Sequence, residues 1–219
     1  MKKTSFILFL GVLLFASCGG GTKNTDGSSA DGLSFSDFDK NLASLLKIEG
    51  EIVVGRVWTD ANGENVLVLS QIKEEHFSDD DGPSSDTRLM AKHFVNEEGN
   101  YRLLSEIDER ESDCGFENRA AFSVSLLNIS DLDKNGVAEI YIVYRMGCTS
   151  ELSPDQLRLV MFENAKKYSI TGTTIADYGD RKEGGKTFVD PSFEKLTEAQ
   201  RNEAMRIWEK AQVSYESFE

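Results

Sequence analysis

Histidine is scarce in this chain, and its scarcity limits the chemistry that the chain can perform. The two histidines, His76 and His93, have no partners at the spacings of a zinc site. The sequence also has no Gly-x-Ser-x-Gly nucleophile elbow, no Walker loop and no dinucleotide-binding glycine motif. Carboxylates are abundant, so a glycosidase-type pair stays open, but the sequence selects no pair. These absences favour a protein without catalytic activity.

Basic residues are outnumbered by acidic residues. The chain has 24 Lys and Arg against 38 Asp and Glu, which gives a formal net charge of −14. Binding to nucleic acid requires a basic surface, and docking on anionic lipid does too. The composition therefore argues against both kinds of partner.

Long hydrophobic runs are also missing, apart from one short run at the start. That run, residues 6–15, is too short for a membrane-spanning helix, which needs about 20 residues. Lys2 and Lys3 precede it and Ala16-Ser17-Cys18 follows it, as in an exported protein with a small-residue cleavage site. A cysteine directly after Ala-Ser resembles a bacterial lipobox, although Phe15 stands where leucine is usual. An ordinary secretory signal and a signal anchor are the alternatives.

The lipobox resemblance implies a domain plan and a location. Residues 1–17 are the predicted signal peptide, 18–32 a flexible Gly- and Ser-rich tether, and 33–219 a single β-rich domain. Cleavage removes two lysines, so 202 residues with a net charge of −16 remain. We expect a lipid anchor on Cys18 in the bacterial cell envelope, at the outer membrane. Whether the protein faces the periplasm or the cell surface stays open.

Cysteine is rare, and its number predicts one disulfide. Once Cys18 carries the lipid, only Cys114 and Cys148 remain in an oxidising compartment. The two residues flank one predicted hairpin and fall nearly opposite each other at its open end. We therefore predict a bridge between them, with two buried free thiols as the alternative.

A short acidic loop is the one stretch whose residue types and spacing together indicate specific chemistry. Residues 131–139 read Asp-Leu-Asp-Lys-Asn-Gly-Val-Ala-Glu. Calcium prefers about six to eight oxygen ligands on a sharply bent backbone, and glycine permits the bend. The predicted calcium ligands are Asp131, Asp133, Asn135, the Val137 carbonyl and Glu139.

The acidic loop departs from an EF-hand in two ways. The twelfth position is Ile142 instead of glutamate, and alternating flanking residues predict strands instead of helices. The alternative is an Asx-rich turn without metal, because Asp and Asn favour such turns unaided. Three converging carboxylates repel one another without a cation, which favours calcium. We expect a weak affinity, on the order of 10⁻⁴–10⁻³ M.

Alternating hydrophobicity and turn residues predict a mainly β fold. We expect about eight strands in an antiparallel meander, curled into a barrel or a sandwich, with a C-terminal α-helix packed on it. The predicted hairpins cover residues 51–70, 87–107, 120–148 and 157–173. The capping box at residues 197–200 begins the helix, which we expect to continue to about Tyr215. Residues 73–86, 108–119 and 177–190 are polar and predict loops.

The same residues carry a resemblance to known families. The acidic loop between strands resembles the calcium loops of FG-GAP and integrin-type blades. Residues 131–174, with Trp58-Thr59-Asp60 and Trp208, are similar to an uncharacterised family of Bacteroides-type lipoproteins, some of which are labelled surface polysaccharide biosynthesis protein. That label implies a role in the cell envelope and transfers no activity.

Two functions follow as hypotheses. The first is a non-catalytic envelope lipoprotein, stabilised by calcium, that binds an envelope protein or gives structural support. The second is a carbohydrate-binding or surface-polysaccharide assembly factor. An exposed Trp58 beside carboxylates would favour the second, because an aromatic ring can stack on a sugar, whereas a buried Trp58 would favour the first.

Overall fold

The structure is a computed structural model that describes residues 33–78, 82–149, 152–213 and 218. The predicted signal peptide, Cys18 and the tether lie outside the described residues, and so does Tyr215. None of the helices within the described ranges is long and apolar enough to cross a membrane.

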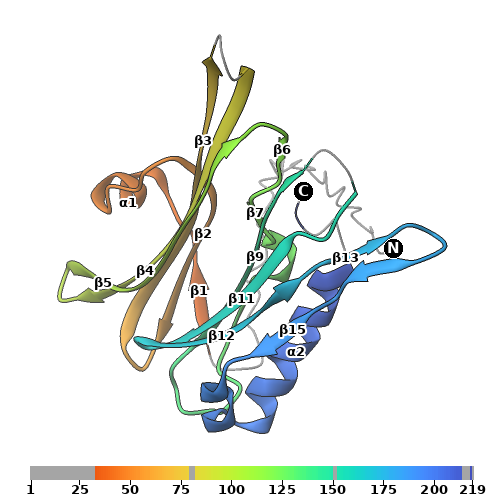
Figure 1. The fold of residues 1–219 in the computed structure, drawn as a ribbon. Helices are drawn as coiled ribbons and strands as arrows, with labels where there is room; N and C mark the ends of the chain where they lie inside the picture. The colour runs from red at the N-terminus through yellow and green to blue at the C-terminus, as the bar shows by residue number, and fades with distance from the viewer. Residues whose placement is uncertain (1–32, 79–81, 150–151, 214–217, 219) are drawn as a thin grey trace, which may run out of the picture.

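Two antiparallel sheets form the centre of the fold (Figure 1). The first sheet has the strand order β1-β2-β3-β4-β5 and is a meander. Its strands are Ser34–Ser36, Glu51–Asp60, Gly63–Ser78, Gly82–Glu97 and Asn100–Cys114. All four pairs of neighbours are antiparallel; short turns join β2 to β3 and β4 to β5, whereas the connection from β1 to β2 contains a helix.

The second sheet has the order β15-β12-β11-β9-β7, and β8 also pairs with β9. Its strands, in chain order from β7, are Ala121–Phe122, Asn128–Ser130, Glu139–Met146, Gln156–Glu163, Lys166–Thr173 and Thr187–Val189. Two smaller strand pairs complete the β structure. They are β6 (Glu117–Asn118) with β10 (Cys148–Thr149), and β13 (Ile175–Asp177) with β14 (Lys182–Gly184).

The two sheets pack face to face through a shared hydrophobic core. Strand β3 contributes Leu67 and Leu69, and β9 contributes Ile140, Ile142 and Tyr144, all of them almost fully buried. Full burial of a large apolar side chain contributes about 1.5–3 kcal/mol. The sheets do not close on each other, so the fold is a sandwich and not a barrel.

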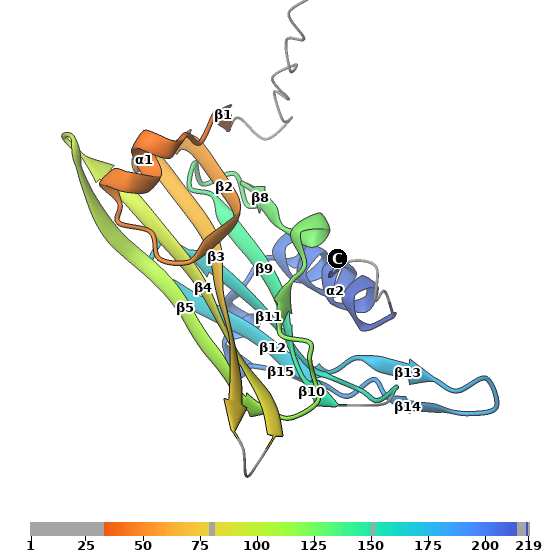
Figure 2. The same ribbon diagram turned by 90° about the horizontal axis from the view of Figure 1, so that it is seen from above.

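A helix covers the outer face of each sheet (Figure 2). Helix α1 (Lys40–Leu45) places Leu42 against the β3 residues Val66 and Val68, which alternate with the inward-facing leucines. Helix α2 (Glu198–Val213) packs on the second sheet through Ile207 and a fully buried Trp208. The prediction of a mainly β fold with a C-terminal helix packed on it is confirmed.

Several local predictions are confirmed as well. Hairpins join β2 to β3, β4 to β5 and β11 to β12 as the turn residues indicate. The capping box is formed: the Gln200 amide donates to Thr197 Oγ1 at 3.3 Å, and the Thr197 amide donates to Gln200 Oε1 at 2.9 Å. The short 3-10 helices η1 (Val124–Leu126) and η2 (Pro191–Lys195) were not predicted.

The predicted loops at residues 73–86, 108–119 and 177–190 are wrong over most of their length. Strands β3 and β4 continue as a long two-stranded ribbon, and β5 runs to Cys114. Residues 182–189 include β14 and β15. These strands are largely exposed, so they carry no apolar alternation for a sequence pattern to detect. The predicted strand over residues 120–126 is also interrupted, because η1 follows the short strand β7.

The predicted disulfide is present, but its setting differs from the prediction. Cys114 and Cys148 are bonded, with their Cα atoms 5.6 Å apart. Cys114 ends β5 and faces Ser85 across the first sheet, whereas Cys148 pairs with Asn118 of β6. The bond therefore ties the first sheet to the β6–β10 pair and does not close a single hairpin.

Removal of this bond is expected to destabilise the domain. The bond closes a sequence separation of 34 residues, and Cys114→Ser/Cys148→Ser should lower the free energy of unfolding by about 3–4 kcal/mol. Urea unfolding of the variant and the oxidised parent measures this difference. Equal unfolding midpoints would show that the bond contributes nothing to stability.

The buried His93 predicts a loss of stability in mild acid. Its ring stacks on Trp58 with the centroids 5.3 Å apart, and its Nε2 lies 3.0 Å from Asn65 Oδ1. Burial lowers the pKa of His93 to about 4. The unfolded chain therefore takes up a proton first, and the stability contribution is complete only above about pH 6.5.

As the pH falls from about 6.5 to 4, His93 should remove up to about 3 kcal/mol of stability. His93→Gln should remove this part of the pH dependence, and His76→Gln, at an exposed position, should leave it in place. Urea unfolding across this pH range gives the slopes. The same slope in the His93 variant and the parent would contradict the assignment.

Candidate metal centre

The acidic loop lies at one end of the sandwich, where four segments meet (lower end of Figure 1). The Ala61 amide in the β2–β3 turn donates to the Gly136 carbonyl at 2.7 Å. Asn62 Nδ2 in the same turn donates to Asn164 Oδ1 of the β11–β12 turn at 2.7 Å. The start of α2 is the fourth segment, and it contributes Gln200.

Asp131 holds the bend of the loop. One carboxylate oxygen accepts from the Asn135 amide at 3.0 Å, and the other accepts from the Gly136 amide at 2.9 Å. Lys134 and Gly136 have positive φ angles of 59° and 84°, which turn these amides inward. The Asp131 side chain is buried, so these hydrogen bonds replace its contacts with water.

Glu139 is completely buried at the first position of β9. Its carboxylate accepts from the Leu132 amide at 2.8 Å, from the Asp133 amide at 3.4 Å and from Gln200 Nε2 at 2.8 Å. Burial is the main cause that raises the pKa of Glu139 above its usual range, and the nearby Asp133 adds to it. The charge at this position is therefore costly unless a cation lies beside it.

Asp133 and Asn135 form the outer part of the loop. Asp133 accepts from the Asn135 amide at 3.1 Å and from Gln200 Nε2 at 3.3 Å. Asn135 Oδ1 accepts from the Val137 amide at 2.8 Å, and Asn135 Nδ2 donates to Glu163 Oε1 at 2.5 Å. The Asn135 oxygen is therefore engaged within the loop.

The structure brings three of the five predicted ligands together. Carboxylate oxygens of Asp131, Asp133 and Glu139 all lie within 4.8 Å of one another. Asn135 belongs to the same hydrogen-bonded loop, and Val137 donates its amide to it. The hydrogen bonds of the alternative, an Asx-rich turn, are formed, so the loop folds through its own hydrogen bonds while three acidic groups stay close together.

Sequence reasoning missed three residues that complete this network. Asp60 Oδ2 accepts from the Ala138 amide at 3.1 Å, and Glu163 and Gln200 contact the loop from β11 and α2. For Gln200, the capping box was a signal, but it marked a helix start and not a partner of Glu139. Asp60 also caps its own turn, because its Oδ1 accepts from the Asn62 amide at 2.8 Å.

Trp58 lies in the core between the sheets, with none of its side chain exposed. Its Nε1 donates to Asp60 Oδ2 at 3.3 Å. The interpretation of Trp58 as a platform for stacking on a sugar is therefore wrong. The alternative, a packing role, is confirmed, and the indole also helps to hold the turn that contacts the acidic loop.

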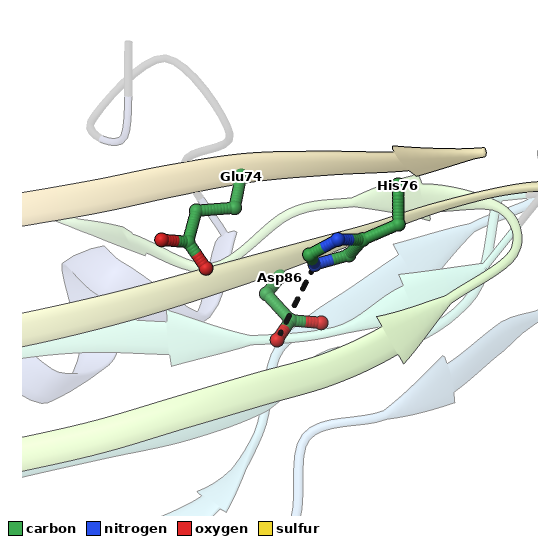
Figure 3. Close-up of side chains that lie close together, drawn as sticks. All are labelled: Glu74, His76 and Asp86. Atoms are coloured by element: carbon green, nitrogen blue, oxygen red, sulfur yellow. Dashed lines mark ion pairs between the residues drawn. The ribbon is translucent and has the colours of Figure 1, made fainter.

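A second group of potential ligands lies on the β3–β4 ribbon, where Glu74, His76 and Asp86 approach one another (Figure 3). Glu74 faces Asp86 across the ribbon, and His76 Nε2 lies 3.7 Å from Asp86 Oδ2. Asp86 already accepts from the Arg110 guanidinium and from the Asp113 amide. These hydrogen bonds lower the pKa of Asp86, so this group acts as an ion-pair network that joins β3, β4 and β5.

Comparisons of the chain with protein-family models, with curated proteins and with solved structures found no match.

The contacts of Gln200 predict that the stability of the domain depends on the link between the acidic loop and α2. Gln200→Ala removes a hydrogen bond to a buried carboxylate and one half of the helix cap, so it should lower the free energy of unfolding by about 2–3 kcal/mol. Asn202→Ala, on the exposed side of the same helix, should change it by less than about 0.5 kcal/mol. Urea unfolding tests both variants, and equal effects would refute the coupling.

Proposed function

We propose that this protein is a non-catalytic, calcium-stabilised β-sandwich of the bacterial cell envelope that acts by binding. The observation that carries the proposal is the convergence of the Asp131, Asp133 and Glu139 carboxylates within 4.8 Å. Two of the three are buried, so water cannot fully screen their repulsion.

A divalent cation is the simplest means of relieving this repulsion. The available donors are oxygens, and hard cations such as calcium prefer oxygen ligands and tolerate irregular coordination. Asp131, Asp133 and Glu139 would supply the charged ligands, and Asn135 and the Val137 carbonyl would supply the neutral ones. The ion would then fix the end of the sandwich at which the four segments meet.

A lipid anchor on Cys18 completes the proposal. It rests on the sequence alone: the basic start, the short apolar run and the Ala-Ser-Cys site. A tether of about 15 residues would let the domain move away from the outer membrane surface. The acidic end would then be free to meet an envelope partner.

The alternative of a carbohydrate-binding or polysaccharide-assembly factor loses the support of Trp58, because that ring is buried. A different feature supports it, namely a polar cleft that the acidic loop shares with the β11–β12 turn and the start of α2.

Calcium should raise the thermal midpoint of the oxidised chain that begins at residue 18, prepared with Cys18→Ser so that no lipid is attached. With a dissociation constant of about 10⁻⁴ M, about 5 mM calcium contributes about 2 kcal/mol of stability. For a domain of this size, the midpoint should rise by about 4–8 °C relative to a sample with chelator. Differential scanning calorimetry measures the shift.

The variant Asp131→Asn/Asp133→Asn should lose this shift, because it removes two charges and keeps side-chain oxygens in the loop. Asp37→Asn/Asp180→Asn is the matched control, since it removes two exposed charges elsewhere and should keep the shift. A parent midpoint that is the same in calcium and in chelator would rule out the calcium site.

A further inference from the structure

A cleft of about 660 Å³ opens beside the acidic loop. Its volume is within the range of sites for small ligands, about 300–1,000 Å³. Asp133, Asn135 and Glu163 line it, and so do Lys166, Lys167 and Lys195. The start of α2 contributes Thr197 and Gln200. The cleft therefore combines carboxylates, ammonium groups, amides and a hydroxyl.

The fold itself brings the lysines to the acidic loop. Lys166 and Lys167 begin β12, and Lys166 faces Glu163 across the β11–β12 hairpin. Lys195 comes from η2, just before α2. Glu163 contacts the acidic loop through Asn135. The β11–β12 hairpin therefore supplies two of the three lysines and also braces the acidic loop.

The three lysines are available to a ligand. Within the described ranges, none of their ammonium groups lies within 4.0 Å of a carboxylate, and all three side chains are exposed. Lys92 and Lys182, by contrast, form ion pairs at 3.8 Å and 3.1 Å.

A bound calcium ion would reverse the sign of the charge in this cleft. Asp133 and Glu163 of the lining and the buried Asp131 and Glu139 of the acidic loop carry four negative charges when all are ionised, and the three lysines carry three positive charges. The balance is one negative charge without the ion and one positive charge with it. An anion would therefore be attracted more strongly to the calcium-loaded cleft than to the metal-free one.

We propose that the cleft binds an acidic saccharide, with its carboxylate on the lysines and its hydroxyl groups on the acidic lining residues. This inference rests on the proposed calcium site, which supplies the change in charge. Asp133 and Glu163 can accept hydrogen bonds from sugar hydroxyls, and Asn135, Thr197 and Gln200 add neutral polar groups. Lys166, Lys167 and Lys195 provide the cations that a carboxylate requires.

Other classes of ligand fit the lining less well. A sulfate ion has no hydroxyl groups to donate, a phosphate ion at neutral pH has only one or two, and the charge of either ion would meet the Glu163 and Asp133 carboxylates directly. A neutral sugar would leave the three lysines without a counter-charge. An apolar ligand would have to remove water from carboxylates and ammonium groups, which is costly. A ligand with both hydroxyl and carboxylate groups matches both the acidic and the basic lining residues of the cleft.

The test uses the chain that begins at residue 18 with Cys18→Ser, and two matched pairs of probes. Sialyllactose is compared with lactose, and trigalacturonate with its methyl ester, by isothermal titration calorimetry at constant free calcium and again in chelator. We expect at least one acidic member to bind in calcium, and its neutral counterpart to bind at least about tenfold more weakly. Binding should weaken in chelator, since coupling between two ligands is reciprocal.

Lys166→Gln/Lys167→Gln/Lys195→Gln should weaken binding of the acidic probe at least about tenfold. Lys40→Gln/Lys73→Gln/Lys210→Gln is the matched control, because it removes three exposed charges outside the cleft and should leave binding unchanged. The cleft variant should keep the calcium-dependent rise in thermal midpoint, which shows that the acidic loop is intact.

Failure of this inference can be told apart from failure of the calcium site. Two results would overturn the acidic-saccharide site and leave the calcium site standing, provided that calcium raises the thermal midpoint as expected. One is that neither acidic probe binds, and the other is that both lysine variants bind the probe equally well. Lysine-dependent binding in chelator, with no calcium shift, would overturn the calcium site and keep the ligand assignment. Inorganic phosphate is titrated as a third probe, and preference for it over both saccharides would also overturn the proposal.

Discussion

Burial of strand β9 on both faces is the constraint on which the rest of the structure depends. Ile140, Ile142 and Tyr144 point into the core between the sheets, while Tyr141 and Val143 point into the core under α2. Both cores therefore require β9 in one register, because a shift by one residue would exchange the two sets of side chains. Glu139, the first residue of this strand, is fixed in a buried place as a consequence.

The fixed position of Glu139 explains why the hydrogen-bonded polar groups of the acidic loop lie together at one end of the sandwich. A buried carboxylate must be satisfied, and amides of the acidic loop with Gln200 of α2 satisfy it. At the disulfide, by contrast, a covalent bond between Cys114 and Cys148 joins the elements. The domain is thus closed by hydrogen bonds to carboxylates in one place and by a covalent bond in another.

Much of this architecture follows from local sequence signals. The hairpin turns and the capping box at Thr197 are short-range patterns, and both occur in the structure. The long ribbon of β3 and β4 was missed because most of its residues are polar, and a strand of polar residues shows no apolar alternation. The Cys114–Cys148 bond was predicted from the number of cysteines, although they do not face each other within one hairpin.

The sequence by itself determined that the acidic loop bends sharply and gathers acidic side chains, because Asp, Asn and Gly direct the backbone over a few residues. Only the tertiary structure decided which distant groups meet that loop. Asp60, Glu163 and Gln200 reach it from three different elements, and the three cleft lysines come from two. Contacts between residues so far apart depend on how the sheets and α2 pack, and no local pattern specifies that packing.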